Sequence, residues 1–385
     1  MAKEMPHVAL LIETSRTYGR DLLRGVKRYI SEHRPWSVYM ELRALDSKVP
    51  PWLKHWRGDG ILTRTGSQAM ADAVRETGVP AIELRATRLK HDLPFIGADN
   101  RAMGRMVAEH LIERGFRRFG VYEIDIEGYF EERRDNFIET LRQAGYPCSI
   151  FQAPGHRERP AEWEKHQDHL ASWVAGLEKP VGLLACTDQL GFWLLDACNR
   201  AGVAVPEEAA VVGAENEESL CTMSTPPLSS VLFNGARIGY EAAAALDRMM
   251  AGGPAPQEPI LVPPIGIVTR QSSDVVAVED HDLAEALRFI REHAHEGITV
   301  EDVLRRVAMS RSALERRMRE AIGRTPKSEI LRVQINLVRQ LLVDTDLTLA
   351  GIAHKAGFRH PQYMAEVFKQ KLGQTPGEYR AAVRL

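Results

Sequence analysis

The sequence predicts two folds in one chain, a two-lobed α/β region followed by an all-α region. From residue 7 to residue 234, short apolar runs of strand length alternate with stretches of helical period. Such alternation builds parallel sheets that are covered by helices on both faces. From Asp282 onward the apolar residues keep a helical period, and one short pattern occurs twice, 50 positions apart.

The α/β region contains more strands than one sheet usually holds, so we predict two lobes. The expected strands are His7–Glu13, Ser37–Leu42, Gly60–Thr63, Ala81–Leu84, Phe95–Asp99, Phe119–Tyr122, Val181–Cys186 and Val211–Ala214. The expected helices are Tyr18–His33, Ala69–Thr77, Met103–Arg114, Arg134–Ala144, His169–Leu177, Gly191–Ala201 and Ala236–Met250, with extended stretches at Ile260–Pro264 and Ile265–Thr269. We expect a domain over 1–275, with lobes of about 1–100 plus 235–260 and 101–234 plus 261–275. The polar stretch Arg270–Asp280 is expected to be the linker.

Composition places the chain among cytoplasmic proteins. Its 385 residues are 44% hydrophobic, yet they contain no apolar run of about 20 residues, so no membrane span is expected. The amino terminus lacks the features of a signal peptide. The four cysteines have no CxxC spacing, which suits inert thiols in a reducing compartment.

The charge is distributed unevenly. Residues 281–385 contain 18 Lys and Arg against 13 Asp and Glu, a charge of +5. Subtraction from the totals of 50 and 52 leaves 32 against 39 in residues 1–280, a charge of −7. A basic tail on an acidic body is typical of a sensor fused to a module that binds a polyanion, and it would also suit an ordinary two-domain enzyme.

The repeated pattern predicts two helix-turn-helix units, at about 300–321 and 349–371, within a domain over 281–385. The chain reads IGRTP around Gly323 and LGQTP around Gly373, and each copy follows a short helix, a tight turn and a second helix. A connecting helix, Ser328–Val343, joins the units. Two such units can place their second helices in successive major grooves, about 34 Å apart.

The polar and apolar positions of these units agree with that prediction. Ser310 lies where an N-cap belongs, and Pro361 suits a first helical position. The residues expected to face the core are Val303, Leu304, Val307, Leu314, Met318, Ile330, Val333, Leu337, Leu341, Leu342, Ile352, Ala353, Ala356, Tyr363, Met364 and Phe368. Residues 311–339 hold eight basic and three acidic side chains, enough to attract a DNA backbone. The alternative is a helical bundle whose arginines form a solvated face.

Residues 283–380 resemble the double helix-turn-helix domain of the AraC/XylS family. The residues that carry the resemblance are the paired GxTP, the run from Ser310 to Arg316, Gly357-Phe358 and the ending Gly373–Arg380. The resemblance implies base readers at Ser312, Glu315, Arg316, His360, Gln362 and Glu366. Outward basic side chains at Arg311, Arg319 and Lys369 are expected to contact DNA as well. His360 and Glu366 depart from the family pattern, so the second unit is expected to bind more weakly or to read different bases.

Polar residues that follow the predicted strands indicate a ligand site in the first domain. Ligands of open α/β sheets bind at the carboxyl ends of strands, which selects Glu13–Arg16 with Thr14 among them, Arg64, Asp99, Asp188, Glu215 and Asn216. Such side chains suit sugar hydroxyls, and Tyr18 or Tyr129 would supply an aromatic ring beneath the sugar. The structural alternatives are a helix cap for Asp188, a cap or hinge for Asp99, and a core position for Tyr18.

The first 270 residues resemble the two-lobed, periplasmic-binding-protein-like (type I) sensors of the lactose/galactose repressor family. The markers are Gly97–Asn100, Cys186–Asp188, Val212–Asn216 and Leu261–Pro264. The resemblance adds Arg133 as a clamp on sugar hydroxyls, with Asp188 and Glu215 as acceptors; the alternative for Arg133 is a surface charge. This sensor followed by an AraC-type reader is similar in order and length to the bacterial xylose operon activators, over the entire chain.

The resemblance implies a transcription regulator, an activator of a pentose operon in which a sugar closes the lobes and alters operator binding. Its expected partners are double-stranded operator DNA, a sugar effector, RNA polymerase and a second copy in a homodimer. We expect no enzyme, cofactor or metal site, because the sequence lacks GxSxG, HExxH and Walker patterns and because His293 and His295 are two residues apart. The alternatives are a sugar-binding protein or a carbohydrate enzyme whose helical domain is a protein-interaction module.

Overall fold

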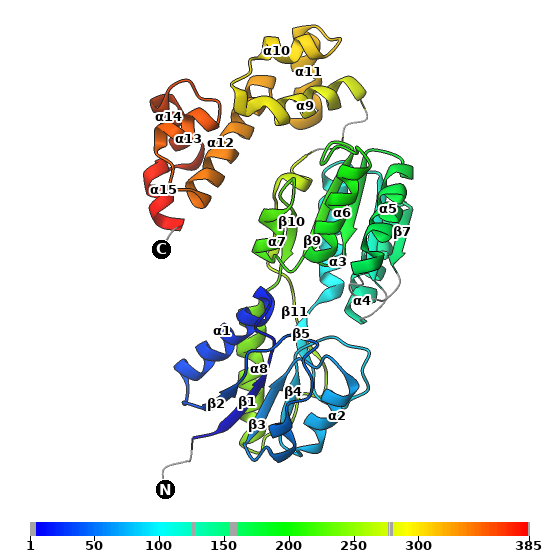
Figure 1. The fold of residues 1–385 in the computed structure, drawn as a ribbon, viewed down its shortest axis with the longest axis vertical. Coiled ribbons are helices and arrows are strands. Elements are labelled where there is room, and N and C mark those ends of the chain that lie inside the picture. The colour runs from blue at the N-terminus through cyan, green and yellow to red at the C-terminus, as the bar shows by residue number, and fades with distance from the viewer. Residues whose placement is uncertain (1–4, 125–127, 154–159, 276, 278–279, 384–385) are drawn as a thin grey trace. The chain divides into compact units, whose positions relative to one another are not determined.

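The chain forms an α/β unit, Met1–Val275, and an all-α unit, Val276–Leu385 (Figure 1). The computed structural model describes residues 5–124, 128–153, 160–275, 277 and 280–383. The predicted order of an α/β fold followed by an all-α fold is confirmed.

The first lobe is built on a parallel sheet with the strand order β2-β1-β3-β4. Ala9, Leu11 and Ile61 point to one face and pack with η1 and α2, whereas the alternate residues of β1 are buried on the other face, where α8 crosses β3 and β4. A second parallel pair, β5 and β11, continues the lobe. Its elements are β1 (His7–Leu11), α1 (Thr17–Glu32), β2 (Ser37–Met40), the 3-10 helix η1 (Pro51–His55), β3 (Gly60–Thr63), α2 (Gln68–Glu76), β4 (Ala81–Glu83), β5 (Ile96–Ala98), α8 (Gly235–Met250) and β11 (Ile260–Val262).

The second lobe contains a six-stranded sheet in the order β12-β10-β9-β8-β6-β7, in which only the edge strand β12 is antiparallel to its neighbour. Its elements are α3 (Asn100–Glu113), β6 (Arg118–Ile124), α4 (Gly128–Gln143), β7 (Cys148–Ala153), α5 (Pro160–Gly176), β8 (Val181–Ala185), α6 (Asp188–Arg200), β9 (Ala209–Ala214), α7 (Glu218–Met223), β10 (Ser229–Leu232), β12 (Gly266–Val268) and the 3-10 helix η2 (Gln271–Ser273). The chain passes between the lobes after β5, after β10 and after β11.

Two strands of this sheet, β7 and β10, were not predicted from the sequence. Polar residues interrupt both, as in CSIFQA and SSVL, so neither has the continuous apolar run of a buried strand. Ser229 and Ser230 of β10 are nonetheless fully buried. Their hydroxyls are hydrogen-bonded, that of Ser229 to the Arg270 carbonyl at 2.9 Å and that of Ser230 to the Asp188 carboxylate at 2.5 Å. Hydroxyls that are hydrogen-bonded can be buried, so β10 is a buried strand although its sequence lacks an apolar pattern.

The predicted linker is wrong at its start. Ser272 is fully buried, and its hydroxyl donates to the Val211 carbonyl at 2.6 Å and accepts from the Ser229 amide at 2.8 Å. Arg270 donates to the Leu228 carbonyl at 3.0 Å. Residues 270–273 therefore belong to the second lobe. Residues 276, 278 and 279 of the predicted linker lie outside the described residues.

All regular secondary structure described in the second unit is helical. Its helices are α9 (His281–His293), η3 (Ala294–Glu296), α10 (Val300–Arg306), α11 (Arg311–Ile322), α12 (Pro326–Asp344), α13 (Leu349–Lys355), α14 (Pro361–Leu372) and α15 (Pro376–Val383). Each pair α10–α11 and α13–α14 is a short helix, a turn and a longer helix, as the sequence predicted. Over the described residues, no helix of the chain is long and apolar enough to cross a membrane.

Candidate functional site

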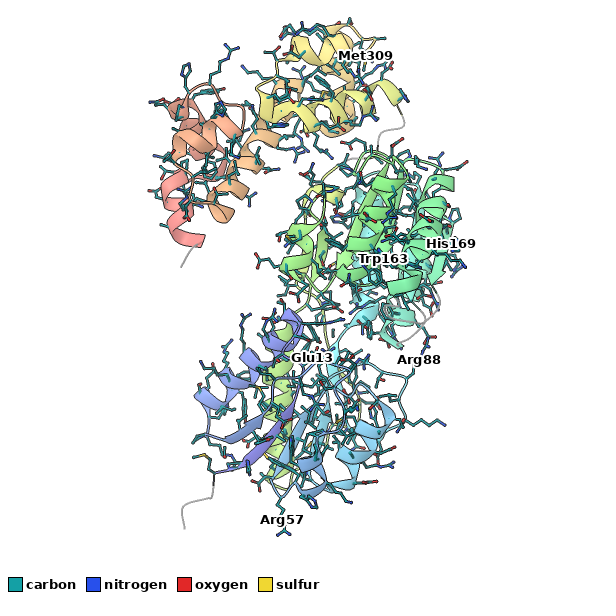
Figure 2. The ribbon with its side chains drawn as sticks, viewed as in Figure 1. Glu13, Arg57, Arg88, Trp163, His169 and Met309 are labelled. Carbon is teal, nitrogen blue, oxygen red and sulfur yellow. The ribbon has the colours of Figure 1, made fainter. Side chains whose placement is uncertain are left out.

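Charged residues follow three neighbouring strands of the first lobe. Glu13, Arg64 and Arg85 come just after β1, β3 and β4, whose carboxyl ends share one edge of the parallel sheet. Glu13 and Arg85 are 1% and 3% exposed, so their charges are removed from water. Glu13 lies at the end of this lobe that faces the second lobe (Figure 2). This is the edge where ligands of open α/β sheets bind.

These buried charges are stabilised by pairing. The Arg64 guanidinium forms an ion pair with the Glu13 carboxylate. Behind it, Glu83 accepts hydrogen bonds from the Thr65 hydroxyl at 2.5 Å and from the Arg85 amide at 2.9 Å. Burial raises the pKa of Glu83 to about 7. The pKa of Arg64 is lowered to about 10, mainly by burial and to a smaller extent by repulsion from Arg85. Arg64 therefore stays charged near neutral pH at the cavity, whereas Glu83 lies behind it, outside the cavity lining.

Tyr18 forms one wall of the site. Its ring lies 4.8 Å from the Arg64 guanidinium carbon, and the Phe233 ring stands edge-on to it at a centroid distance of 6.0 Å. Burial raises the pKa of Tyr18, so the phenol stays neutral. Tyr18 is half-buried and borders a cavity, so it contributes both to packing and to the cavity wall.

Arg133 contributes the main cation of the second lobe. It is 4% exposed, so the alternative of a surface charge is wrong. Its guanidinium donates to Asn100 Oδ1 at 2.9 Å, to the Cys186 carbonyl at 2.5 Å and to Glu215 Oε1 at 3.3 Å. A Cβ on Gly104 of α3 would lie 2.3 Å from the Arg133 carbonyl, so this glycine permits the close approach of α4 that places Arg133.

The turn after β9 directs two neighbouring residues differently. Glu215 and Asn216 have φ of 99° and 49°, left-handed values that are uncommon for residues other than glycine. Glu215 contacts Arg133 and, at 3.7 Å, Arg16 of the first lobe. Asn216 instead accepts a hydrogen bond from Arg270 at 2.8 Å. The carboxylate faces the space between the lobes, whereas the amide supports the turn.

Asp188 lies at the start of α6 but does not cap it, so the alternative of a helix cap is wrong. The cap is Thr187, which accepts from the Leu190 amide. Asp188 Oδ1 accepts from the Ser230 hydroxyl at 2.5 Å, and Oδ2 accepts from the Glu217 amide at 2.6 Å. Burial raises the pKa of Asp188 to about 8.

Glu217 joins the two lobes. Its carboxylate accepts from the Thr17 amide at 2.6 Å and from the Thr17 hydroxyl at 2.9 Å, and Arg20 lies 3.6 Å away. Thr17 begins α1, so a carboxylate of the second lobe neutralises the positive end of a helix of the first. We call the contact of Glu217 with Thr17 and Arg20 the inter-lobe latch.

Four of the predicted effector residues line one cavity between the lobes: Tyr18, Arg64, Arg133 and Glu215. The other three do not. Thr14 is bonded to the Arg43 backbone, Asp188 to Ser230 and Glu217, and Asn216 to Arg270. The lining also includes Leu84, Arg85, Ala86, Ala98, Asn100 and Tyr129. Arg85 was missed, although its place after β4 satisfies the rule that selected Arg64. Asp99 caps α3 by accepting a hydrogen bond from the Ala102 amide, which agrees with the structural alternative of a helix cap.

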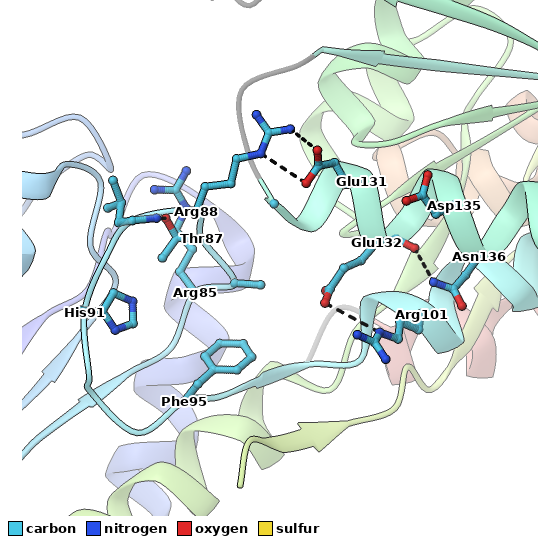
Figure 3. Close-up of a pocket in the computed structure, with 13 residues that line it drawn as sticks. Arg85, Thr87, Arg88, His91, Phe95, Arg101, Glu131, Glu132, Asp135 and Asn136 are labelled. Atoms are coloured by element: carbon cyan, nitrogen blue, oxygen red, sulfur yellow. Dashed lines mark hydrogen bonds and ion pairs between the residues drawn. The ribbon is translucent and has the colours of Figure 1, made fainter.

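The cavity between these side chains measures about 30 Å³, the volume of one water molecule. A second cavity of about 670 Å³ shares Arg85 and Ala86 with it. Its walls carry opposite charges, with the ion pairs Arg88–Glu131 at 2.6 Å and Arg101–Glu132 at 3.8 Å (Figure 3). Ligand pockets usually measure about 300–1,000 Å³, so a sugar must separate the side chains of the small cavity or extend into the large one.

The first helix-turn-helix unit presents α11 as its outer helix. Ser310 caps it by accepting from the Ala313 amide, as predicted. Leu314 and Met318 are fully buried. The predicted DNA contacts Arg311, Ser312, Arg316 and Arg319 are exposed, and Glu315 is half-buried. Arg311 bonds Glu301 at 2.7 Å and Glu315 at 3.3 Å, so Glu315 also orients a neighbouring cation.

The second helix-turn-helix unit presents α14 in the same way. His360, Gln362, Glu366 and Lys369 are exposed, and Pro361 is the first residue of the helix, as predicted. Tyr363 was predicted to face the core, and this is wrong because its side chain is 46% exposed. Phe358, whose ring lies 6.2 Å from that of Tyr363, is the buried aromatic residue of the pair. The outer face of α14 therefore carries an additional aromatic side chain.

Family models match successive parts of the chain. Residues 7–101 match a model described as the XylR N-terminal domain, residues 108–273 a periplasmic binding protein-like domain, and residues 303–382 a helix-turn-helix domain. The order agrees with the observed fold, a two-lobed α/β unit followed by a helical unit.

Relatives match over nearly the full length. The chain is 31% identical to the xylose operon regulatory protein of Escherichia coli, covering 97% of this chain and 96% of that one. It is 30% identical to the xylose operon regulatory protein of Haemophilus influenzae, covering 99% of both. A solved structure described as the xylose-binding transcription activator XylR superposes with a TM-score of 0.80 at 29% identity, covering 99% of both chains. A regulator from Alkaliphilus metalliredigens shares the first unit's fold, with a TM-score of 0.57 at 16% identity, covering 70% of this chain and 99% of that one.

Proposed function

The chain belongs to the family of xylose operon regulatory proteins, and from this premise we propose that it is a transcription regulator that binds a pentose, D-xylose or a close relative, between the lobes of its first unit. The sugar activates transcription of the operon by altering how the second unit binds operator DNA. The site acts by binding alone, without turnover. The observation that supports this proposal is the convergence of Tyr18, Arg64, Arg133 and Glu215 on one cavity.

The chemistry of that cavity suits a small polyol. Arg64 and Arg133 supply donors, Glu215 and Asn100 supply acceptors, and the ring of Tyr129 lies 4.7 Å from the Arg133 guanidinium carbon, so aromatic and polar groups alternate around the space. A sugar hydroxyl can replace the 3.3 Å contact between Arg133 and Glu215 by donating to the carboxylate and accepting from the guanidinium.

The second unit is proposed to bind double-stranded DNA through the exposed faces of α11 and α14. Bases would be read by Ser312, Glu315, Arg316, His360, Gln362 and Glu366, with Arg311, Arg319 and Lys369 as further contacts. A homodimer in the cytoplasm is the proposed working form, with RNA polymerase as the partner of the activated complex.

The test combines a ligand screen with DNA binding. Thermal unfolding is followed with a panel of pentoses and hexoses, because a ligand that binds the native state raises the midpoint. We expect D-xylose or a related pentose to give the largest rise and to change the affinity for operator DNA at least fivefold. A sugar that saturates the protein without altering DNA affinity or the footprint would refute the regulatory coupling. Turnover of the sugar would favour the alternative of an enzyme.

A further inference from the structure

The second unit contains two separate hydrophobic cores that meet on one helix. The first includes Leu287, Leu314 and Ile330 and holds α9, α10 and α11 against the start of α12. The second includes Ile335, Ile352 and Phe368 and holds α13 and α14 against the rest of α12. Each core belongs to one helix-turn-helix unit, and the two units are related through the shared helix α12 and through the residues at their junction.

A polar residue, Gln334, occupies that junction. Val333 packs against the first core and Ile335 is buried in the second, so Gln334 lies between them. Gln334 is 5% exposed, and its side-chain nitrogen donates to the Ala294 carbonyl at 2.9 Å and to the Gly357 carbonyl at 3.2 Å. Ala294 directly follows α9, which packs in the core of the first helix-turn-helix unit. Gly357 forms the turn between α13 and α14 of the second helix-turn-helix unit. One amide is thus bonded to both units.

The backbones of the two helix-turn-helix units touch at the same place. Gly357 has a φ of 77°, and a Cβ there would lie 2.6 Å from the Ala294 carbonyl oxygen and 2.6 Å from the Gly297 amide nitrogen. The turn at Gly357 therefore lies directly against the backbone of residues 294–297, with no room for a side chain between them.

We propose that Gln334 is a positioning residue that fixes the spacing and rotation of α11 relative to α14, and thereby sets the number of base pairs between the two DNA segments that the protein reads. The proposal rests on the proposed DNA-binding function. A buried amide with two fixed acceptors accepts one arrangement of its neighbours, in the way that a buried polar residue sets register in a coiled coil. An apolar side chain of the same size would tolerate several arrangements.

The first test measures the arrangement without DNA. Spin labels are attached to full-length protein carrying Glu320→Cys on α11 and Lys371→Cys on α14, both exposed positions. We expect a single narrow distance distribution in the parent. Gln334→Met keeps the length but removes the donors, and Gln334→Glu keeps the shape but only accepts; each should at least double the width of the distribution. Asn336→Met, an exposed change on the same helix, is the control. Unchanged widths in both Gln334 variants would overturn the proposal.

The second test measures spacing on DNA. The full-length protein selects a duplex from a random 30-base-pair library, and one base pair is then added or removed between the two protected segments. Each such step moves the segments by about 3.4 Å and rotates them by about 34°. We expect a loss of at least tenfold in affinity for the parent and the Asn336 control, and less than threefold for Gln334→Met.

Each further outcome of these tests decides between the two proposals. Equal spacing preference in the parent and the Gln334 variants would overturn the positioning role. If the parent selects no duplex, the DNA-binding function fails, while the spin-label distances still test the coupling of the units. If both variants unfold in circular dichroism, Gln334 determines folding and the proposal fails.

Discussion

Replacing Glu217 by glutamine tests the inter-lobe latch. The carboxylate receives two hydrogen bonds from Thr17, at 2.6 and 2.9 Å, and lies 3.6 Å from Arg20. A hydrogen bond to a charged group contributes about 1.5–3 kcal/mol, and a negative charge at a helix start about 0.3–1 kcal/mol. The Arg20 side chain is 43% exposed, so its pairing adds less than about 1 kcal/mol.

Glutamine keeps the shape and one acceptor oxygen but loses the charge. We therefore expect Glu217→Gln to weaken the bridged arrangement by about 1.5 kcal/mol, which is roughly tenfold. If the sugar binds that arrangement and the free protein rests open, the dissociation constant for the sugar rises by the same factor. Titration calorimetry with the sugar that gives the largest thermal shift measures the change.

Glu218→Gln provides the matched control, because Glu218 is the exposed neighbour and loses the same charge. A double-mutant cycle with Thr17→Val isolates the contact, since valine removes the hydroxyl and keeps the amide. We expect a coupling energy of about 0.5–1.5 kcal/mol. The latch would be refuted if Glu217→Gln and Glu218→Gln changed sugar affinity equally, or if the cycle gave no coupling.

Three further predictions concern single residues. Arg133→Lys should weaken sugar binding at least tenfold in calorimetry, because one ammonium cannot bond Asn100, the Cys186 carbonyl and Glu215 together. The control Arg142→Lys, an exposed change on the same helix, should have no effect. Asp188 has its pKa raised to about 8, so its contribution to stability is complete below the ordinary value near about 4 and is lost as the pH rises through 8. Asp188→Asn should therefore flatten the fall of the unfolding midpoint between pH 6 and pH 8.5 seen by calorimetric scanning, and an equally steep fall would contradict this. Arg316→Ala should cost about 1–3 kcal/mol on the cognate duplex and relax preference at one base pair in binding assays, with Arg305→Ala as control; equal loss on every sequence would make Arg316 a phosphate contact.

The sequence predicted the fold well because strands buried on both faces and amphipathic helices leave periodic patterns. Where polar residues are buried and hydrogen-bonded, the pattern fails. The strand β10 begins with two serines, and the stretch 270–273 is polar yet buried, so hydropathy placed one in a loop and the other in a linker. Hydrogen-bond partners distant in the sequence determine both cases, and a local pattern carries no information about them.

The site was predicted in part for a related reason. The strand-end rule, which depends only on topology, selected Arg64 and Glu215, and both border the cavity. It also selected Thr14, Asp188 and Asn216, whose side chains point into bonds with their own surroundings. The rule identifies backbone position, whereas the direction of a side chain depends on partners that the tertiary structure supplies.

The turn of residues 215–217 links ligand contact to lobe contact. Glu215 holds an unusual φ of 99°, which costs about 1–3 kcal/mol for a residue with a side chain, so its neighbours must hold it there. They do so through Ser230, whose hydroxyl accepts from the Asn216 amide at 3.0 Å and donates to Asp188, while Asp188 accepts from the Glu217 amide. The side chain of Glu215 lines the cavity, and that of Glu217 forms the latch. Because one short, strained segment carries both carboxylates, the proposed binding of a sugar at Glu215 would also move the anchor of Glu217. The proposed function then predicts that binding and the contact between the lobes change together, with Asp188, which bonds Ser230 and the Glu217 amide and is not among the cavity-lining residues, as the support common to both.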